Sequence, residues 1–361
     1  MKKIGIMTTG GDCSGLNSAI YNIVRGAHKR GWQTYGILDG TDGLNAKIPQ
    51  IIKLDANTLP PERAYTAGSF LRNGNVSQNN NFERAVQTNR VAQFNKQLKK
   101  ALSELKLDAL IIIGGNGSIS LAWQNRDVYS DLQLICIPKT IDMDIPLTDR
   151  TIGFDTAVSQ LTHFCDDLML TARSHHRWFV VQSMGRKCGM LALTAGVAAG
   201  ASAILIPEIK FDVDELINHI KHADTDYGII MVSEGISLRG HSGEPATMIS
   251  RKLTAAGIAN RTAFPEHIQR AGNTTPNDRL LAASMAAAAI SAIANNETYV
   301  MTALQNGEIT TVGLDAVVAS GRPDRDPNID GLTISNATVD DDNLLLVAAD
   351  DMDIYIGETK E

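Results

Sequence analysis

Four polar side chains with the chemistry of a catalytic site lie in one short stretch, PKTIDMDIP (138–146). These side chains are Lys139, Thr140, Asp142 and Asp144. They follow the apolar run LQLICI, which is typical of a buried strand, so they stand where that strand ends. Asp142 and Asp144 are two residues apart, and in an extended segment both carboxylates face one side. Two like charges on one side are costly unless a cation or a reaction uses them.

The types of these side chains fit phosphoryl transfer. One carboxylate can accept the proton of an attacking alcohol, and a second can hold a Mg²⁺ ion that bridges phosphates. Lys139 and Thr140 can stabilise charge on a phosphoryl group in transit. For this stretch taken alone, the alternative is a surface turn with solvated aspartates.

Two glycine-rich turns favour the first interpretation. TTGGDCSGLNSAI (8–20) and IIIGGNGSIS (111–120) each join a short apolar strand to a helix. Glycines let the backbone approach a phosphate closely, and a helix N-terminus offers free N–H groups and a positive dipole. Neither turn has the GxxxxGK[ST] or GxGxxG pattern, and either one alone could be a tight turn of any α/β protein. Because open α/β sheets bind ligands at the carboxyl ends of their strands, the three turns together indicate one phosphate site.

The elements that must position these turns alternate along the chain. Expected strands cover 4–7, 34–38, 109–113, 132–137, 178–185, 203–208 and 228–235. Expected helices cover 16–30 and 91–105, and lie near 189–200, 212–222 and 247–258. This rhythm predicts an α/β fold with mostly parallel sheets covered by helices on both faces. The 361 residues suffice for two such sheets, with a first boundary near Thr151.

Composition narrows the class of protein. The net charge of −7 argues against nucleic acid or an anionic membrane as the main partner. No run of apolar residues is long enough to span a membrane, and no signal-peptide segment is recognisable. The four cysteines show neither CxxC pairing nor zinc spacing, which favours reduced thiols in a cytoplasmic protein.

Six motifs, in one order, resemble those of the phosphofructokinase family: GGDCSGLN, GGNGS, PKTIDMD, TIGFDTAV, SMGRKCGMLAL and HIQRAG…PNDRLLA. They cover residues 1 to about 300. The resemblance implies two three-layer α/β domains, with a phosphoryl donor and a sugar phosphate meeting in the cleft between them. The donor domain would comprise 1–151 and about 269–310, and the sugar-phosphate domain 152–268 and the C-terminal segment. It also implies a homo-oligomer, dimer or tetramer, with shared active sites.

The resemblance further implies roles for individual residues. Asp142 matches the catalytic base for the 1-hydroxyl of fructose 6-phosphate, and Thr140, Arg186 and Lys139 lie beside the transferring phosphoryl. The donor phosphate or nucleotide would contact Gly11, Gly115, Asn116, Gly117, Ser118 and Arg72. The sugar phosphate would contact Met184, Gly185, Arg186, Glu234, His267 and Arg270, besides Thr140 and Asp142. Arg177 and Arg261 match arginines that the family takes from a neighbouring subunit, and Asn116 and Asp144 would lie beside Mg²⁺.

Several positions depart from the family pattern, mostly on the donor side. Asn116 replaces an acidic residue beside the metal, which lowers the expected affinity for Mg²⁺. Asn75 aligns with an arginine that reaches the donor's terminal phosphate, and Arg72 is expected to substitute for it. Met143 replaces an asparagine next to the base. Gly117 leaves room for a nucleotide's α-phosphate, whereas Lys139 is usual in pyrophosphate users.

We therefore expect a 6-phosphofructokinase that uses ATP. A reversible, pyrophosphate-dependent enzyme is the first alternative. A sugar-phosphate-binding homologue with weakened or lost turnover is the second, and Asn116, Asn75 and Met143 are the residues that favour it.

Overall fold

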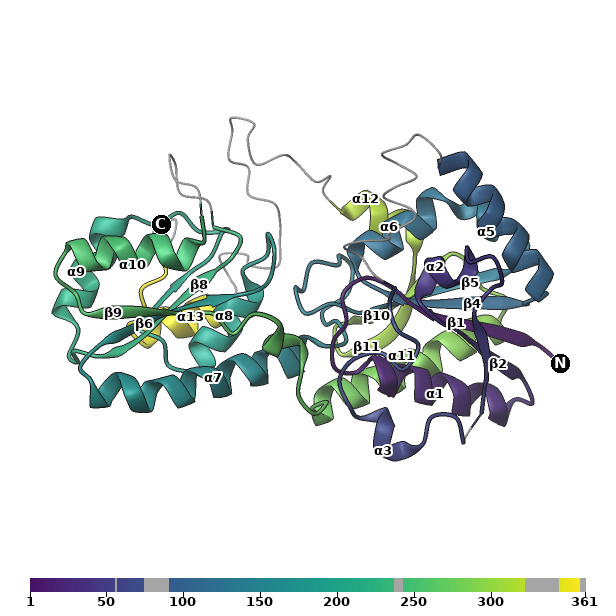
Figure 1. Ribbon diagram of the computed structural model, residues 1–361, viewed down its shortest axis with the longest axis horizontal. Coiled ribbons are helices and arrows are strands. Elements are labelled where there is room, and N and C mark those ends of the chain that lie inside the picture. The colour runs from purple at the N-terminus through teal and green to yellow at the C-terminus, as the bar shows by residue number, and fades with distance from the viewer. Residues whose placement is uncertain (56, 75–90, 237–242, 322–343, 358–361) are drawn as a thin grey trace. The chain divides into compact units, whose positions relative to one another are not determined.

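Two β-sheets of different size organise the chain (Figure 1). In the computed structural model, residues 1–55, 57–74, 91–236, 243–321 and 344–357 are described. They form two units. Unit 1 comprises 1–140, 145–155 and 270–321, and unit 2 comprises 141–144, 156–269 and the C-terminal segment from 322.

The sheet of unit 1 has seven strands in the order β11-β10-β5-β4-β1-β2-β3. The five inner strands are parallel, and only β11 and β3 at the two edges are antiparallel to their neighbours. All six residues of β4 are buried, as expected for a parallel strand with both faces covered. The strand bounds are β1 Lys3–Thr8, β2 Gln33–Ile37, β3 Ile51–Leu54, β4 Ala109–Gly114, β5 Gln133–Pro138, β10 Val300–Gln305 and β11 Glu308–Gly313.

Helices cover both faces of this sheet (Figure 1). On one face α1 packs closely on α11, since a Cβ placed on Gly26 of α1 would be 3.3 Å from the Ile290 side chain. On the other face α5 buries Phe94, Leu98 and Leu102 in the core, in the helical spacing that the sequence shows. The helix bounds are α1 Leu16–Lys29, α2 Gly40–Leu44, α3 Pro61–Ala64, α5 Val91–Leu105, α6 Asn116–Gln124, η1 Arg126–Tyr129, α11 Pro276–Ala294 and α12 Leu314–Ser320.

Unit 2 is built on four parallel strands in the order β7-β8-β6-β9. Helices α9 and α10 cover one face, where Leu216, Ile220 and Ile249 join the core, and α7 and α8 lie on the other (Figure 1). The strand bounds are β6 Trp178–Ser183, β7 Ala203–Leu205, β8 Gly228–Ser233 and β9 Asn260–Ala263. The helix bounds are α7 Phe154–Ser174, which begins in unit 1, α8 Met190–Ala198, α9 Val213–His222, α10 Pro245–Ala255, η2 Glu266–Arg270 and α13 Leu344–Asp351.

The C-terminal segment, for which the sequence predicts no role, packs on unit 2. Leu346 and Ala349 of α13 are buried, and the backbone N–H of Ile204 donates to the carbonyl of Tyr355 at 2.8 Å. The segment therefore continues the edge of the sheet next to β7.

The predicted fold class, two α/β domains with mostly parallel sheets, is confirmed. Three short segments lie elsewhere than the predicted boundaries place them: Ile141–Asp144 belongs to unit 2, and 152–155 and 311–321 belong to unit 1. For Ile141–Asp144 the reason is local, because the Cys188 thiol lies 4.0 Å from the Met143 carbonyl and Arg186 pairs with Asp142. That one unit binds the donor and the other the sugar phosphate stays a prediction.

Candidate active site

Three turns of unit 1 pack against one another at one edge of its sheet. The strands before them, β1, β4 and β5, are adjacent and parallel, so their carboxyl ends coincide. The N–H of Thr9 donates to the Ile113 carbonyl at 3.0 Å, and the N–H of Lys139 donates to the Gly114 carbonyl at 3.0 Å. A Cβ on Gly114 would lie 2.6 Å from Thr9 Oγ1, so this position needs glycine.

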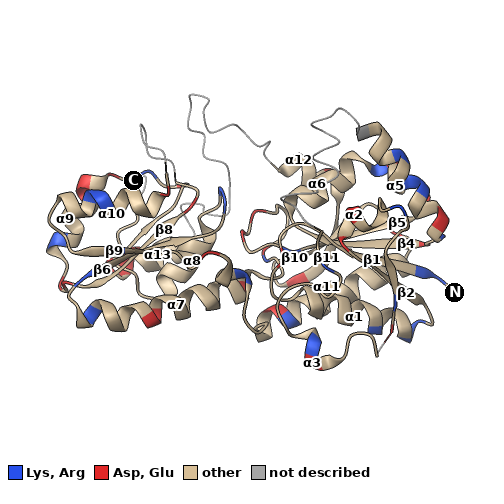
Figure 2. Cartoon of the chain, viewed as in Figure 1, with Lys and Arg blue, Asp and Glu red and all other residues tan. Residues whose placement is uncertain are grey.

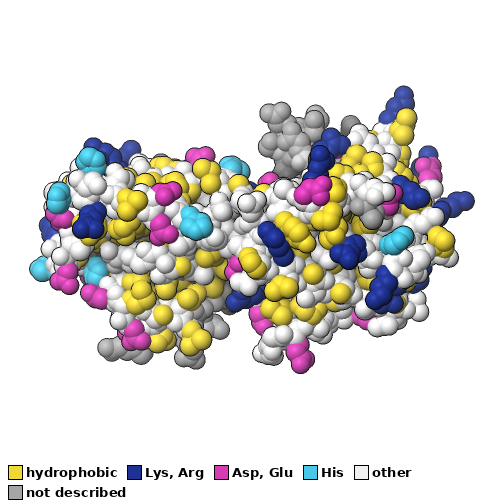
Figure 3. Space-filling view, turned by 90° about the horizontal axis from the view of Figure 1, so that it is seen from below, with side chains coloured by type: hydrophobic (Ala, Val, Ile, Leu, Met, Phe, Trp, Pro, Cys, Tyr) yellow, Lys and Arg dark blue, Asp and Glu magenta, His cyan; other side chains and the backbone are white. Residues whose placement is uncertain are grey.

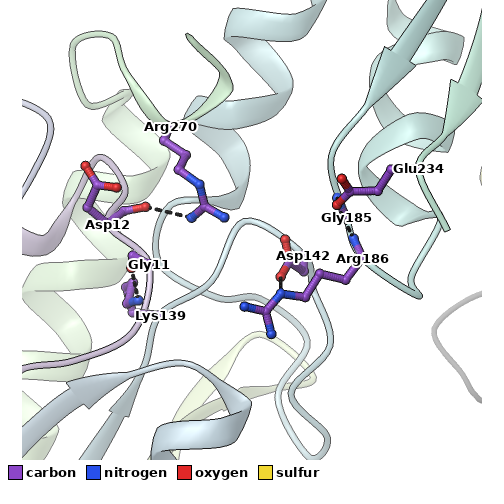
Figure 4. A network of polar contacts seen from close by, with 8 residues as sticks. All are labelled: Gly11, Asp12, Lys139, Asp142, Gly185, Arg186, Glu234 and Arg270. Atoms are coloured by element: carbon purple, nitrogen blue, oxygen red, sulfur yellow. Dashed lines mark hydrogen bonds and ion pairs between the residues drawn. The ribbon is translucent and has the colours of Figure 1, made fainter. Parts of the chain in front are cut away.

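Lys139 brings a buried positive charge to these turns. Its side chain is almost fully buried, and its ammonium donates to the carbonyl oxygen of Gly11 (Figure 4). The ammonium also lies beside Gly10, 3.7 Å from the point where a Cβ would be, and the Ser118 hydroxyl is 3.5 Å from the same point. A cation and a hydroxyl thus converge on the glycine turn, which is the arrangement that phosphate oxygens require.

Arg270 lies on the same glycine turn. Its Nη1 donates to the Asp12 carbonyl at 3.0 Å and would be 2.6 Å from a Cβ on Gly11 (Figure 4). Any larger residue at position 11 would therefore displace the guanidinium. The structure places Arg270 in unit 1, whereas most residues expected on the sugar side lie in unit 2.

The third group of predicted donor contacts stands at the start of α6. Gly115 is the N-cap residue, so the free N–H groups of Asn116, Gly117 and Ser118 are in the first turn of the helix. Gly117 faces open space among the described residues, because none of their atoms outside its own helix turn lies within 4 Å of its Cβ position. The Asn116 amide oxygen accepts a long hydrogen bond of 3.5 Å from the Ser120 hydroxyl.

Arg72 is held by its neighbours. Its Nη2 lies 2.9 Å from Asp39 Oδ2, its carbonyl accepts from Thr8 Oγ1 at 2.9 Å, and its φ of 59° is left-handed. An aspartate already neutralises this guanidinium, so a phosphate would compete with Asp39 for it. Asn75 lies outside the described residues, as does most of the polar loop 72–83.

In unit 2, the predicted base is close to a predicted phosphoryl ligand. Asp142 is buried, and its Oδ2 lies 3.5 Å from Nε of Arg186, whose side chain is 70% exposed (Figure 4). Arg186 has a φ of 53°, a left-handed conformation that is uncommon for a residue with a side chain. Strain of this kind persists only where surrounding contacts fix the backbone.

Two side chains fix the backbone that carries Arg186. Oε1 of Glu234 accepts from the N–H of Gly185 at 3.0 Å and from that of Arg186 at 2.7 Å (Figure 4). The buried Gln269 accepts from the N–H of Met184 at 3.0 Å. Sequence reasoning missed Gln269, and its only signal is a polar residue between the predicted ligands in HIQRAG.

Other predicted residues of unit 2 lie at its surface. Neither His267 nor Arg177 makes a side-chain hydrogen bond or ion pair with another described residue. Within the described part of the chain, the Arg261 side chain on β9 donates only to the carbonyl of Asn260, at 2.9 Å. No contact among the described residues joins these three to Asp142, so their roles stay predictions.

Comparison with known proteins shows the family of the chain. The family model described as Phosphofructokinase matches residues 3–293. The chain belongs to the phosphofructokinase family. The predicted resemblance is thereby confirmed.

The relatives agree with this assignment. An ATP-dependent 6-phosphofructokinase 1 of Nostoc sp. is 34% identical over 99% of each chain, and an ATP-dependent 6-phosphofructokinase of Chloroflexus aurantiacus is 36% identical over 87% of this chain and 90% of its own. The solved phosphofructokinase of Saccharomyces cerevisiae has a TM-score of 0.76 at 26% identity over 89% of this chain, which spans 46% of the yeast chain. A pyrophosphate-dependent phosphofructokinase from Marinobacter aquaeolei, with a TM-score of 0.74, 19% identity and coverage of 88% of this chain and 84% of its own, shares the fold.

Among the described residues, no three His, Cys, Asp or Glu side chains gather as a metal site. The predicted Mg²⁺ ligands are the Asn116 amide of unit 1 and the Asp144 carboxylate of unit 2. Each offers the kind of oxygen that Mg²⁺ takes beside water and substrate phosphates, and their joint role stays a prediction.

Neither positive nor negative side chains dominate the surface of either unit. Basic and acidic side chains are mixed over both units, and the most continuous basic stretch follows the lysines of α5 (Figure 2). No helix in the described part of the chain has the length and apolar character to cross a membrane.

Proposed function

We propose that this phosphofructokinase-family protein is a glycolytic, ATP-dependent 6-phosphofructokinase of the cytoplasm. It transfers the terminal phosphoryl group of ATP to O1 of fructose 6-phosphate and gives fructose 1,6-bisphosphate. The observation that carries the proposal is the ion pair between Asp142 and Arg186 in unit 2. In the sequence, Asp142 comes shortly after the unit 1 segment that carries the glycine-rich turns. The unit boundary runs between Thr140 and Ile141, so the chain itself holds Thr140 within two residues of Asp142.

The chain's own residues divide the work of the reaction. Asp142 takes the proton of the O1 hydroxyl as this oxygen forms its bond to the terminal phosphorus. The bond between that phosphorus and the bridging oxygen breaks, and ADP leaves with the electron pair. Thr140 and Arg186 stabilise the negative charge on the phosphoryl oxygens in transit.

The donor is held by the turns of unit 1. Gly11, Gly115 and Ser118 offer backbone and hydroxyl contacts, and Lys139 offers positive charge. Arg72 would add its charge where a donor phosphate displaces Asp39 from it. Open space at Gly117 supports ATP, since an α-phosphate needs that room. The names of the full-length relatives agree with ATP. Asp144 and Asn116 would hold Mg²⁺, which would offset the negative charge of the donor phosphates.

The acceptor is held by Met184, Gly185, Arg186, Glu234, His267 and Arg270. Glu234 uses Oε1 for the backbone of the Arg186 loop, which leaves Oε2 for a sugar hydroxyl. Several positive side chains suit the dianionic 6-phosphate.

Arg177 and Arg261 would complete the same site in a neighbouring copy of a homodimer or homotetramer. Exposed apolar side chains support such an assembly: Leu170 on α7 is 72% exposed and Ile268 is 57% exposed. Hydrophobic side chains are numerous on the face of unit 2 seen in Figure 3.

A coupled assay with fructose 6-phosphate and Mg²⁺ tests the function. Turnover with ATP and none with pyrophosphate is the expected result. Turnover with pyrophosphate alone would assign the reversible alternative. Tight binding of fructose 6-phosphate without turnover would make the chain a sugar-phosphate-binding homologue.

A further inference from the structure

The loop that carries Arg186 is anchored by carboxylates at both ends. Glu234 accepts from the N–H groups of Gly185 and Arg186 at the start of the loop. Glu208, which follows β7, accepts from the N–H of Gly189 at its end, at 2.7 Å. The N–H of Cys188 donates to the Gly185 carbonyl at 2.9 Å and closes the loop as a turn. Glu208 is not among the residues that sequence reasoning assigns to the site.

The approach of Glu208 to Gly189 is close enough to require glycine. A Cβ on Gly189 would lie 2.5 Å from Oε2 of Glu208 and closer still to Cβ of Ile206. Gly189 is also the N-cap of α8, so the carboxylate sits at the positive end of that helix. Both features fix where the loop ends.

Cys188 extends these contacts to the segment that holds the base. Its thiol lies 4.0 Å from the Met143 carbonyl, within donor distance for sulfur. Glu208 accepts from Gly189, the next residue in the chain after Cys188, so the chain itself joins the two contacts. Glu208, Gly189, Cys188 and Met143 therefore form a connected series that ends one residue from Asp142.

We infer that Glu208 and Cys188 are positioning residues, which hold Arg186 and Asp142 in register for phosphoryl transfer without touching either substrate. The inference rests on the proposed function. Its physical basis is that Arg186 is 70% exposed, and an exposed ion pair contributes little to its own geometry. The strained backbone of the loop must then be set by its anchors.

Replacement of Glu208 tests this role. Glu208→Ala removes the acceptor for Gly189 and should lower kcat/KM for fructose 6-phosphate about 30-fold, through both kcat and KM, because small misplacements at a reacting centre are costly. The KM for ATP should stay within about twofold. Glu208→Gln keeps an acceptor oxygen and should stay within about threefold of the wild type. Glu215→Ala, on the exposed side of α9, is the matched control and should change nothing.

A double-mutant cycle separates positioning from general stability. In the Arg186→Ala background, Glu208→Ala should cost no more than about threefold further, because residues that act through one another are not additive. Full multiplication of the two effects would overturn the inference. So would a folded Glu208→Ala protein with unchanged kinetics.

Cys188 provides an independent variant if Glu208→Ala does not fold. Cys188→Ala should lower kcat about fivefold while Cys188→Ser, which retains a donor, recovers most of it. Equal activity of the two variants and the wild type would overturn the role of Cys188.

Calorimetry with fructose 6-phosphate separates a failure of the proposed function from a failure of the positioning inference. If the wild type binds the sugar but does not turn over, weaker binding by Glu208→Ala and recovery by Glu208→Gln still support positioning of the loop, and equal binding overturns it. A wild-type chain with neither turnover nor sugar binding would overturn both proposals.

Discussion

Nε of Arg186 lies 3.5 Å from Oδ2 of Asp142, and the two side chains differ sharply in exposure, 70% for the arginine and 7% for the aspartate. A buried carboxylate thus has a solvent-exposed cation beside it. Such an arrangement suits a base that must accept a proton beside a group that must follow the charge on a phosphoryl oxygen. In unit 2, this pair supplies both the proposed base and a proposed ligand of the phosphoryl group.

Arg186→Gln should lower kcat/KM for fructose 6-phosphate about 100-fold, because a charged donor to the phosphoryl oxygens is lost. Arg186→Lys should recover part of this, about tenfold, since it keeps the charge but not the guanidinium fork. Steady-state kinetics measure both. Arg251→Gln, exposed on α10, should match the wild type. Wild-type kinetics in Arg186→Gln would exclude the assigned role.

Lys139→Met should weaken the donor site and the fold together. Loss of the charge-assisted hydrogen bond from the buried Lys139 ammonium to the Gly11 carbonyl should lower the free energy of unfolding by about 1.5–3 kcal/mol. Loss of the charge should raise the KM for ATP about tenfold. Chemical denaturation and kinetics provide the two readouts, and the exposed Lys29→Met is the control. An unchanged KM for ATP would mean that Lys139 serves the fold alone.

Gly117→Asp should change the choice of donor without harm to folding, because in the described part of the chain no atom outside its own helix turn lies within 4 Å of the Cβ position. A carboxylate there would repel the α-phosphate and should lower kcat/KM for ATP about 100-fold. Gly117→Ala adds a Cβ without charge and should stay within about threefold. If Gly117→Asp uses ATP as well as Gly117→Ala does, the donor's α-phosphate does not lie at this turn.

Buried thiols should make stability fall at alkaline pH. Burial raises the pKa of both Cys13 and Cys136 from 9.0 to about 12, against the opposing charges of Lys139 and Arg270 for Cys13. Below pH 9 the thiols are neutral in folded and unfolded chains alike. Between pH 9 and 12 only the unfolded chain ionises, so the free energy of unfolding falls by about 1.4 kcal/mol per pH unit for each thiol.

Denaturant unfolding from pH 8 to 11 measures this slope. Cys136→Ala should reduce the slope by the contribution of one thiol, about 1.4 kcal/mol per pH unit. An equal slope in wild type and variant would contradict a raised pKa of Cys136 in the folded chain. In the native protein at pH 8, a thiol reagent should leave Cys13 and Cys136 unmodified.

The sequence predicts β1, β2, β4, β5, β6, β7 and β8 and the turns after them because their signals are local. β4 is a continuous apolar run ended by glycines, and it forms at Ala109–Gly114, one residue longer than expected. The edge strands β3, β9 and β11 and the inner strand β10 were missed, since each is partly exposed and carries no long apolar run. Helix α13 was missed because its local sequence does not reveal that it packs against α8.

In the candidate site, too, residues with a local sequence signal are predicted and residues placed by tertiary contacts are not. Asp142, Lys139 and the glycine turns are visible in sequence, because each lies where a strand ends. Gln269 and Glu208 are not, since their partners, Met184 and Gly189, come from other segments and only the tertiary fold brings them together.

The turnover number of Asp142→Asn tests the central claim most directly. The amide keeps the shape of the side chain but cannot accept the O1 proton, so kcat with ATP and fructose 6-phosphate should fall about 1,000-fold while both KM values change less than about threefold. Asp224→Asn, an exposed aspartate of unit 2, should retain wild-type turnover. A folded Asp142→Asn enzyme with kcat within tenfold of the wild type would show that another group takes the proton, and the proposed mechanism would be wrong.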